Sequence, residues 1–515
     1  MRLFKNTSFN PLKTIALLTY TALIGILTAC EQQTKPLTPL QEGQVLSKTY
    51  CSSCHKYPEP ALIDSISWAG HVLPAMASRL GIQVYGDDQY VNNPNKKSTV
   101  TFDEWTKIVA FYKNTAPKIL KAAVPPVKAQ NNWAFFSLKM PAQKVSAATT
   151  TMVAFDTLSR HFYTSDMDNM RLYQWSDKMV LQASEKFESP CVDVKFYKDS
   201  KQQARGAFTF IGSFDAFDTP EGKIYDIDLK SLKNMGGEIT IAKKLNRPVQ
   251  SASADFNKDG LPDWLTCQFG HNGGELSLLT QGAGNTFTKK TIRNITGPTN
   301  ISTGDFNNDG WPDFMCLFAQ GDEGIWMFLN DKKGGFTSQN LLRFPPVYGS
   351  TNFQLVDFNN DGKLDILYTC GDNSDYSRVL KPYHGVYIFL NQGNYKYKQA
   401  WFYPINGATK AIAADFNGDK KRDIAVIAFF SDLKNNPAEG FTYFEQTQTM
   451  KFTANNIPVN KYGRWLSMAV EDYNHDGKPD IILGNLSVGF INQPGVTHTW
   501  DGKTPFMVLQ NDHGK

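Results

Sequence analysis

The sequence predicts a mainly β protein, a seven-bladed β-propeller with cation-binding loops, preceded by a small all-α domain. Three observations support this prediction. Five C-terminal segments share the pattern D-[FY]-N-x-D-[GK]-x-x-D and begin roughly 50 to 58 residues apart, a spacing typical of repeat architectures. Each repeat contains four short runs rich in β-branched and aromatic residues. Two units with the same strand content but no aspartate-rich segment, at 147–186 and 190–244, precede them.

The N-terminus reads as a targeting segment. Basic residues precede an apolar run at 14–29, which ends in Leu-Thr-Ala before Cys30. This ending resembles the lipobox of bacterial lipoproteins. The resemblance implies cleavage of residues 1–29, lipidation of Cys30 and anchoring in the bacterial cell envelope. Glu31 favours the outer membrane, facing the periplasm or the cell surface. The alternatives are an uncleaved anchor helix and a plain signal peptide.

Charge gives no case for nucleic-acid binding. The formal net charge of +4 falls to +1 once the three basic residues of the leader are removed. The expected segments are a leader at 1–29, a tether at 30–39, the small all-α domain at 40–118, a linker at 119–131 and the propeller at 132–515.

The stretch Cys51-Ser52-Ser53-Cys54-His55 matches the attachment signature for c-type haem. In this interpretation Cys51 and Cys54 form thioethers to the haem, and His55 ligates the iron from the proximal side. A disulfide or half of a zinc site is the alternative, but zinc needs a second pair of ligands, and none follows nearby.

Three helices are expected around this motif, at 40–51, 68–80 and 102–112. Thr101 and Glu104 have the spacing of a capping box for the third, and Trp105, Ile108, Val109 and Tyr112 share one face. Residues 86–100 read as a surface loop. The arrangement resembles a small class I cytochrome c.

The resemblance implies that Met76, in Pro74-Ala75-Met76, is the distal iron ligand. His71 is the rival and would give a lower potential. Met76 lies only 21 residues after His55, which is short for this family.

The aspartate-rich segments have the oxygen ligands and spacing that Ca²⁺ prefers. Glycine at position 6 suits a turn with positive φ, whereas Lys420 replaces it in the fourth copy and predicts weaker binding there. The predicted ligands at positions 1, 3, 5 and 9 are Asp255, Asn257, Asp259, Asp263; Asp305, Asn307, Asp309, Asp313; Asp357, Asn359, Asp361, Asp365; Asp415, Asn417, Asp419, Asp423; and Asp472, Asn474, Asp476, Asp480.

An EF-hand would need a glutamate at position 12 and flanking helices, but here the flanks are strand-like. A solvated Asx-rich turn is the remaining alternative. The loops and strands of 245–515 resemble the FG-GAP/VCBS repeats of integrin-like propellers. We therefore expect up to five structural calcium ions rather than catalytic ones.

The last repeat is one strand short, and the run 133–140 is an unassigned strand before the first blade. We expect this run to complete the seventh blade and close the ring. Cys191, Cys267, Cys316 and Cys370 read mainly as small buried side chains, with their disulfide state left open.

One insertion, 371–385, is rich in functional groups and is a candidate ligand or docking site; His271 is a weaker candidate. The chain contains no nucleophile elbow, P-loop, zinc-protease or dinucleotide motif.

The expected function is an electron-transfer lipoprotein, a carrier rather than a self-contained enzyme, with an unidentified redox partner or substrate. A binding propeller with haem as sensor or relay, and an oxidoreductase whose propeller face feeds the haem, are the alternatives.

Overall fold

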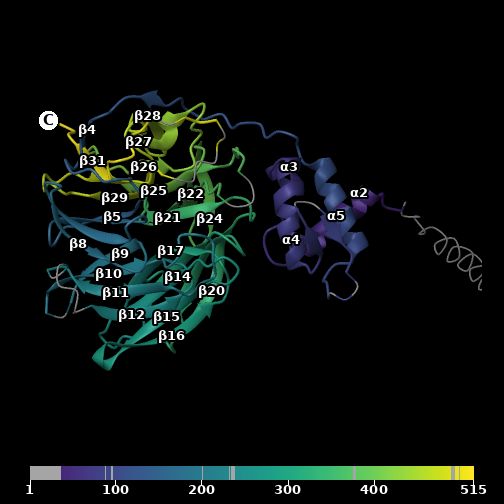
Figure 1. Cartoon of the computed structure of the whole chain (residues 1–515), viewed down its shortest axis with the longest axis horizontal. Helices are drawn as coiled ribbons and strands as arrows, with labels where there is room; N and C mark the ends of the chain where they lie inside the picture. Colours follow the sequence, from purple (N-terminus) through teal and green to yellow (C-terminus); the bar gives the residue numbers. More distant parts are fainter. Residues whose placement is uncertain are drawn as a thin grey trace, which may run out of the picture.

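The computed structural model describes residues 36–514 apart from 87, 88, 94, 96, 200, 231, 233–237, 375–377, 489–492, 494 and 498. The predicted leader and Cys30 lie outside the described residues. Figure 1 shows a helical unit and a β-propeller joined by an extended segment. No helix within the described ranges is long and apolar enough to cross a membrane.

The helical unit contains the three helical regions that the sequence predicts, together with a small hairpin that it does not. Its elements are α2 Pro39–Cys51, η1 Pro60–Leu62, α3 Ser65–Ser67, the π-helical turn η2 Trp68–Val72 continuing into α4 Leu73–Arg79, β1 Gln83–Tyr85, β2 Gln89–Val91 and α5 Phe102–Thr115. Strand β2 lies in the segment expected to be a surface loop, because it pairs with β1.

Capping boxes define where the two long helices begin. The Oγ1 of Thr101 accepts the N–H of Glu104 at 3.2 Å, and Glu104 Oε2 accepts the N–H of Thr101 at 2.8 Å, as predicted. Thr38 and Gln41 form a second box at the start of α2. Satisfying these N–H groups fixes the register of both helices.

Helices α2 and α5 cross at close range at Gly43. A Cβ added to Gly43 would lie 2.2 Å from the carbonyl oxygen of Lys107 and 2.9 Å from the Cβ of Phe111. On α5, Trp105, Ile108 and Tyr112 are buried as predicted. Phe111 is buried too, whereas Val109 is only half-buried, since the crossing turns the buried face slightly.

The propeller has seven sheets, and within each blade consecutive strands pair antiparallel. The first two blades are β5 Thr150–Asp156, β6 His161–Asp166, β7 Arg171–Ser176, β8 Leu181–Lys186; and β9 Cys191–Lys198, β10 Ala204–Phe210, β11 Gly222–Asp228, β12 Ile239–Leu245. Blades three to five are β13 Pro248–Ala254, β14 Asp263–Gln268, β15 Glu275–Gly282, β16 Thr286–Arg293; β17 Pro298–Gly304, β18 Asp313–Phe318, β19 Gly324–Asn330, β20 Phe336–Arg343; and β21 Ser350–Val356, β22 Asp365–Cys370, β23 Gly385–Asn391, β24 Tyr397–Pro404. The sixth is β25 Ala408–Ala414, β26 Asp423–Ala428, β27 Phe441–Gln448 and β28 Lys451–Asn456, and the seventh begins with β29 Trp465–Glu471, β30 Asp480–Asn485 and β31 Phe506–Asn511. Two short turns, η3 Ala283–Asn285 and η4 Pro437–Gly440, lie between strands.

The N-terminal strand closes the ring as predicted. Strand β4, Phe136–Lys139, pairs antiparallel with β31, with Leu138 opposite Leu509. The preceding β3, Gln130–Asn131, pairs in parallel with β28 of the sixth blade. The C-terminal end of the predicted linker is therefore part of the propeller.

Stacking of the blades explains the sequence pattern of the second strands. All six residues of β14, β18, β22, β26 and β30 are buried, because each strand lies between two neighbouring blades. Side chains on the innermost strands also accept hydrogen bonds from the next blade: Gln250 from the N–H of Ile301 at 2.6 Å, and Gln354 from the N–H of Ala413 at 2.7 Å.

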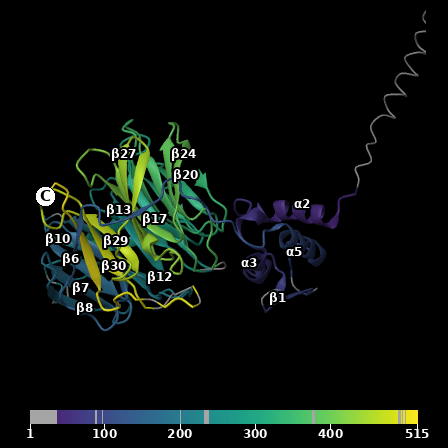
Figure 2. The same cartoon turned by 90° about the horizontal axis from the view of Figure 1, so that it is seen from above.

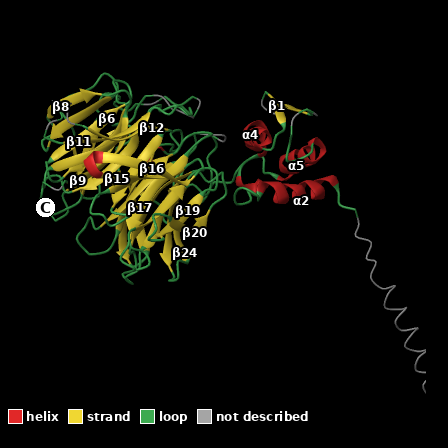
Figure 3. Ribbon diagram, turned by 90° about the horizontal axis from the view of Figure 1, so that it is seen from below, coloured by secondary structure: helices red, strands yellow, loops and turns green. Residues whose placement is uncertain are grey.

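The two faces of the propeller are formed by different connections between strands. The aspartate-rich loops join the first and second strands of their blades, so they lie on one face. The connections between second and third strands, and from one blade to the next, lie on the opposite face because adjacent strands are antiparallel. The helical unit contacts this second face: Lys56 Nζ donates to the carbonyl of Arg343 at 3.1 Å, and Arg79 donates to Asn272 Oδ1 at 2.7 Å. Figure 2 and Figure 3 show the helical unit beside the propeller.

Candidate functional site

A cavity of about 360 Å³ lies between the helical unit and the propeller. Its volume is in the range of cofactor and small-molecule sites. The helical unit lines it mainly with aromatic and aliphatic side chains, whereas the propeller contributes several polar residues. The propeller residues are His271, Thr296, Ala319, Gln320, Gly321, Pro346, Val347, Gly349, Asp372 and Lys381.

All four residues that the sequence nominates for haem binding line this cavity: Cys51, Cys54, His55 and Met76. Cys51 is the last residue of α2, and the turn that follows brings Cys54 to the same opening. Burial raises the pKa of the Cys51 thiol to about 11, so the thiol is protonated at neutral pH. A protonated thiol is a poor nucleophile, which argues against thiolate catalysis here.

The zinc interpretation of the cysteine pair gains no support from its surroundings. Among the residues that the structure describes, no three His, Cys, Asp or Glu side chains gather as a metal-binding group. The six described cysteines are free thiols, and the four in the propeller are buried, as expected. Cys267 and Cys316 lie with their Sγ atoms 4.0 Å apart in adjacent blades.

The imidazole of His55 is oriented by its own backbone neighbour. Its Nδ1 lies 3.0 Å from the carbonyl oxygen of Lys56. A carbonyl only accepts, so Nδ1 carries the proton and Nε2 keeps its lone pair. Burial lowers the pKa of His55, which further favours the neutral ring. A neutral imidazole with an oriented Nδ1–H is the form that ligates a metal.

The structure separates the two candidate distal ligands. Met76, on α4, is half-buried and lines the cavity. His71, five residues earlier on η2, is exposed and is not part of the cavity lining. The fit therefore favours Met76.

Aromatic side chains form the back of the cavity. The rings of Trp68 and Tyr112 lie 4.4 Å apart between centroids. Their polar atoms are satisfied elsewhere: Trp68 Nε1 donates to the carbonyl of Pro60 at 2.9 Å and Tyr112 Oη to that of Pro58 at 2.8 Å. The ring faces are thus left as an apolar wall, which suits the flat apolar surface of a porphyrin.

The propeller wall is held in place by Asp218. Its carboxylate accepts the backbone N–H groups of His271, Asn272 and Gly273 at 2.8 to 3.1 Å. Burial alone would raise the pKa of Asp218, but these N–H groups outweigh burial and bring it to about 2. This contact presents His271 to the cavity and Asn272 to Arg79 of the helical unit.

Two buried ionisable groups lie behind this wall, and sequence reasoning missed one of them. Glu323 is 0% exposed, and its Oε1 accepts the N–H of Ser350 at 2.7 Å. Burial, with a smaller contribution from the nearby charge of Asp372, raises its pKa to about 8. His384, in the insertion singled out above, is 1% exposed, and burial lowers its pKa well below the ordinary value. The signal for Glu323 was an acidic residue between two strongly apolar strands.

That insertion reaches the cavity. Its residues Asp372 and Lys381 belong to the cavity lining, and Lys381 Nζ donates to Asn373 Oδ1 at 2.8 Å. Lys381 is buried. The position of this segment at the cavity is consistent with the expectation that it is a ligand or docking site.

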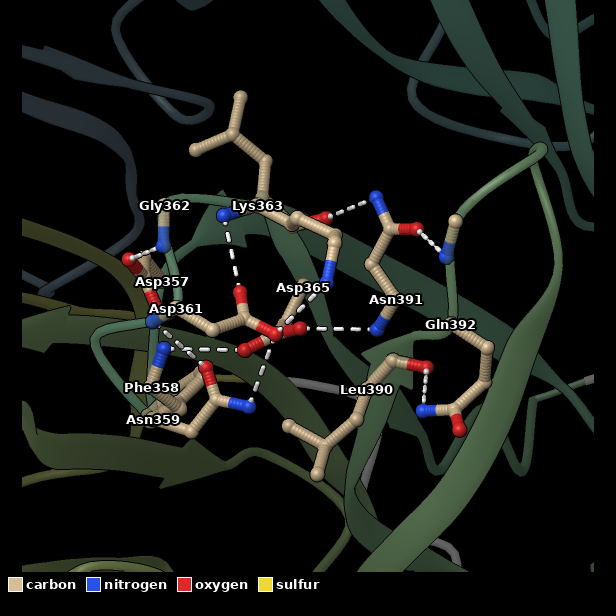
Figure 4. A network of polar contacts seen from close by, with 12 residues as sticks. Asp357, Phe358, Asn359, Asp361, Gly362, Lys363, Asp365, Leu390, Asn391 and Gln392 are labelled. Carbon is tan, nitrogen blue, oxygen red and sulfur yellow. Dashed lines mark hydrogen bonds and ion pairs between the residues drawn. The ribbon is translucent and has the colours of Figure 1, made fainter.

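The aspartate-rich loops are organised by their own backbone. In the third copy, Asp357 accepts the N–H groups of Asp361 at 3.2 Å and Gly362 at 2.8 Å (Figure 4). Asp365 accepts the N–H of Phe358 at 3.0 Å and that of Asn391 at 2.8 Å, which ties the loop to the end of β23. Each carboxylate oxygen has a second lone pair that a hard cation could use. In the described geometry, however, no three acidic side chains of these loops gather as a metal-binding group.

Position 6 of each loop has positive φ, as predicted: Gly260, Gly310, Gly362 and Gly477 lie between 81° and 85°. Lys420 takes the same conformation at φ 67°, which is unfavourable for a residue with a Cβ. Its loop compensates with glycine at position 4, where the other copies place Lys258, Asn308, Asn360 and His475 in the left-handed region.

One comparison with known protein families identifies the repeats. The family model for the FG-GAP-like repeat matches residues 255–316 and 305–368. No curated protein matches the chain. Among solved structures, the chain is similar to BBS1N in its complex with ARL6DN, at 9% identity and a TM-score of 0.40 over 74% of this chain and 98% of that one. It is also similar to an ancestral GH74 enzyme (9%, TM-score 0.47, 72% and 51%) and to the β-propeller domain of Cps50 (Swd1) from Myceliophteria thermophila (9%, TM-score 0.42, 67% and 96%).

Proposed function

We propose that this chain is an electron-transfer protein that carries one c-type haem in the cavity between its two parts. Cys51 and Cys54 would hold the haem covalently, and His55 and Met76 would ligate its iron. One observation carries the proposal. The four side chains come from α2, the turn after it and α4, the first and last of them 25 residues apart in the chain, and all four line one apolar cavity of about 360 Å³. A bound haem supplies reversible one-electron chemistry.

The protein's own residues set the conditions for that chemistry. The Lys56 carbonyl orients His55 so that Nε2 faces away from the backbone. The rings of Trp68, Trp105 and Tyr112 exclude water from the back of the cavity, which lowers the local dielectric and favours the less charged ferrous state. A methionine ligand acts in the same direction.

A visible spectrum of the chain, produced with haem-maturation machinery, tests the proposal. We expect a reduced α-band of c type, and a weak sulfur-to-iron band in the oxidised form that disappears in Met76→Ala and persists in His71→Ala. A c-type α-band without the sulfur-to-iron band in the unmodified chain would show that Met76 is not the distal ligand. A chain that takes up no haem would overturn the proposal.

A second function is favoured by the polar propeller wall. His271, Asp372 and Lys381 line the same cavity, so a substrate bound there would lie beside the haem. The chain would then be an oxidoreductase whose propeller binds the substrate and whose haem receives electrons. Haem reduction by sugars, alcohols or amines, absent in a Lys381→Met variant but kept in the exposed-site control Lys398→Met, would support this function. If none of these compounds reduces the haem, the electron-carrier function remains the proposed one.

We further infer that the protein is anchored in the bacterial envelope through Cys30 and that calcium ions stabilise the propeller loops. The lipobox-like sequence before Cys30 supports the first inference. The five repeated oxygen-rich loops support the second. Fractionation of cells that express the chain or its Cys30→Ala variant tests the anchor, since only the unmodified chain is expected in the membrane fraction.

A further inference from the structure

A second cavity, of about 280 Å³, lies on the same propeller face. Insertions between the second and third strands of three successive blades contribute to it. The described residues that line it belong to the connections β22–β23, β26–β27 and β30–β31, together with Arg464, which immediately precedes β29. The residues used in the argument below are Asn373, Arg378, Ser431, Lys434, Arg464 and Gln493.

The lining is strongly cationic. Arg378, Lys434 and Arg464 face one carboxylate, Asp432. Asp432 is occupied by its own loop, since it accepts the N–H of Lys434 at 3.2 Å, the N–H of Asn435 at 3.0 Å and the side-chain amide of Asn435 at 2.9 Å. The described lining therefore has a surplus of positive charge.

Arg464 is built into the wall in a fixed orientation. Its side chain is 5% exposed, and its Nη2 donates to the carbonyl of Phe429 at 3.0 Å. The guanidinium carbon lies 4.1 Å from the ring centroid of Phe429 and 5.8 Å from that of Trp500. Burial lowers the pKa of Arg464 to about 10.

The cavity also has an apolar side and neutral polar groups. Leu380, Phe430 and Leu433 line it next to Asn373 and Ser431. A planar guanidinium matches a carboxylate with two parallel hydrogen bonds. The amides and the hydroxyl suit the hydroxyl groups of a small organic molecule.

We propose that this cavity binds a small hydroxylated organic carboxylate, such as a sugar acid, with its carboxylate held by Arg464 and Arg378. Asn373 links the site to the first cavity, because its Oδ1 accepts Lys381 Nζ and Lys381 lines that cavity. The hydrogen-bonded pair Asn373–Lys381 therefore separates this cavity from the one proposed for haem. The binding step itself does not depend on haem.

Titration calorimetry on the purified chain, loaded with haem and without it, tests the proposal. The probes are glucuronate, gluconate and malate, with glucose as a neutral analogue and sulfate as an inorganic anion. We expect at least one of the three carboxylates to bind in both preparations, and glucose and sulfate not to bind. Binding of sulfate as tight as that of the carboxylates, or no binding of any carboxylate, would overturn the proposal.

Variants locate the binding. Arg378 and Lys434 are exposed, so Arg378→Ser with Lys434→Ser should fold normally and weaken carboxylate binding at least tenfold. Lys398→Ser removes an exposed cation from the outer strand β24 and should leave binding unchanged. Equal affinity in the double variant and the control would place the ligand elsewhere. Because the readout is heat, a chain that fails to take up haem can still confirm or overturn this site.

Discussion

At the scale of single residues, Glu323 is a buried carboxyl group whose surroundings disfavour its charged form. Glu323 sits in a fully buried site with one backbone hydrogen bond, among Asp372, Lys381 and the tyrosines around Cys370. Its neutral form is favoured at neutral pH because burial raises its pKa to about 8. Such groups beside a cavity are typical of functional sites, although structural networks also produce them.

Replacing Glu323 should remove a pH dependence of stability. The folded-state pKa lies above the ordinary value, so its contribution is complete below about pH 4.5 and is lost as the pH rises toward 8. Relative to Glu323→Gln, the free energy of unfolding of the unmodified chain should therefore fall between pH 5 and pH 8, by on the order of 4 kcal/mol. Urea denaturation at several pH values measures this difference.

The exposed Glu221→Gln is the control for the same charge change. It should follow the pH profile of the unmodified chain. A flat difference between the Glu323→Gln variant and the unmodified chain across this range would show that Glu323 ionises freely.

At the scale of elements, two contacts decide whether the parts assemble. The crossing of α2 over α5 requires a residue without a side chain at Gly43, and the seventh blade requires a strand from the other end of the chain. Salt bridges from Lys107 to Glu42 and Asp103 surround the crossing, but exposed pairs of this kind contribute little.

Gly43→Ala should destabilise the helical unit, because its Cβ would lie 2.2 Å from the Lys107 carbonyl. We expect a loss of about 1–3 kcal/mol, the usual cost of overpacking. Gly70→Ala is the matched control: its Cβ would meet no atom within 4 Å, and alanine favours helix. Helical circular dichroism during thermal unfolding distinguishes them, and equal melting of both variants would contradict the tight crossing.

Phe136→Ala should weaken ring closure. Phe136 is buried in β4, and its ring lies 5.3 Å from that of Tyr443 and 6.0 Å from that of Phe416. The expected loss is about 3–5 kcal/mol. Lys139→Ala, on the same strand but exposed, should cost far less. Similar denaturation midpoints for the two variants would mean that β4 contributes little to the propeller.

At the scale of the whole molecule, the two faces of the propeller carry different features. The aspartate-rich loops lie on one face, and both cavities lie on the other, formed by connections and insertions that differ from blade to blade. Regular strands thus supply a rigid ring, and loops supply chemistry.

Chelation tests the proposed role of the loop face. If calcium is bound, EDTA should lower the melting temperature by several degrees and added calcium should restore it, because the binding free energy stabilises the folded state. Asp361→Asn should reduce this increment, since the amide still accepts the Lys363 N–H but lacks the charge. Asp331→Asn is the control, because Asp331 forms a similar turn outside the aspartate-rich loops, with N–H groups of Lys333 and Gly335 at 2.8 Å. A melting temperature indifferent to EDTA would overturn the calcium proposal.

Local pattern was enough to predict much of the fold. The spacing of the aspartate-rich loops, the strand runs between them, the capping box at Thr101 and the missing strand supplied by 133–140 are all confirmed by the structure. The repeats are also matched, over 255–368, by the FG-GAP-like family model. The Cys51–His55 motif and Met76 were nominated from spacing and resemblance, and haem itself stays a prediction.

The composition of the two cavities could not be read from the chain. His271, Asp372 and Lys381 meet Cys51 and Met76 only because the helical unit packs against one face of the propeller. Arg464 and the crossing at Gly43 were likewise invisible, since each depends on groups far away in sequence. Periodicity reports which side of an element is buried, but the identity of the groups across a contact is decided by how whole elements pack. The sequence by itself therefore determined the parts, and the tertiary structure decided which of their side chains share a site.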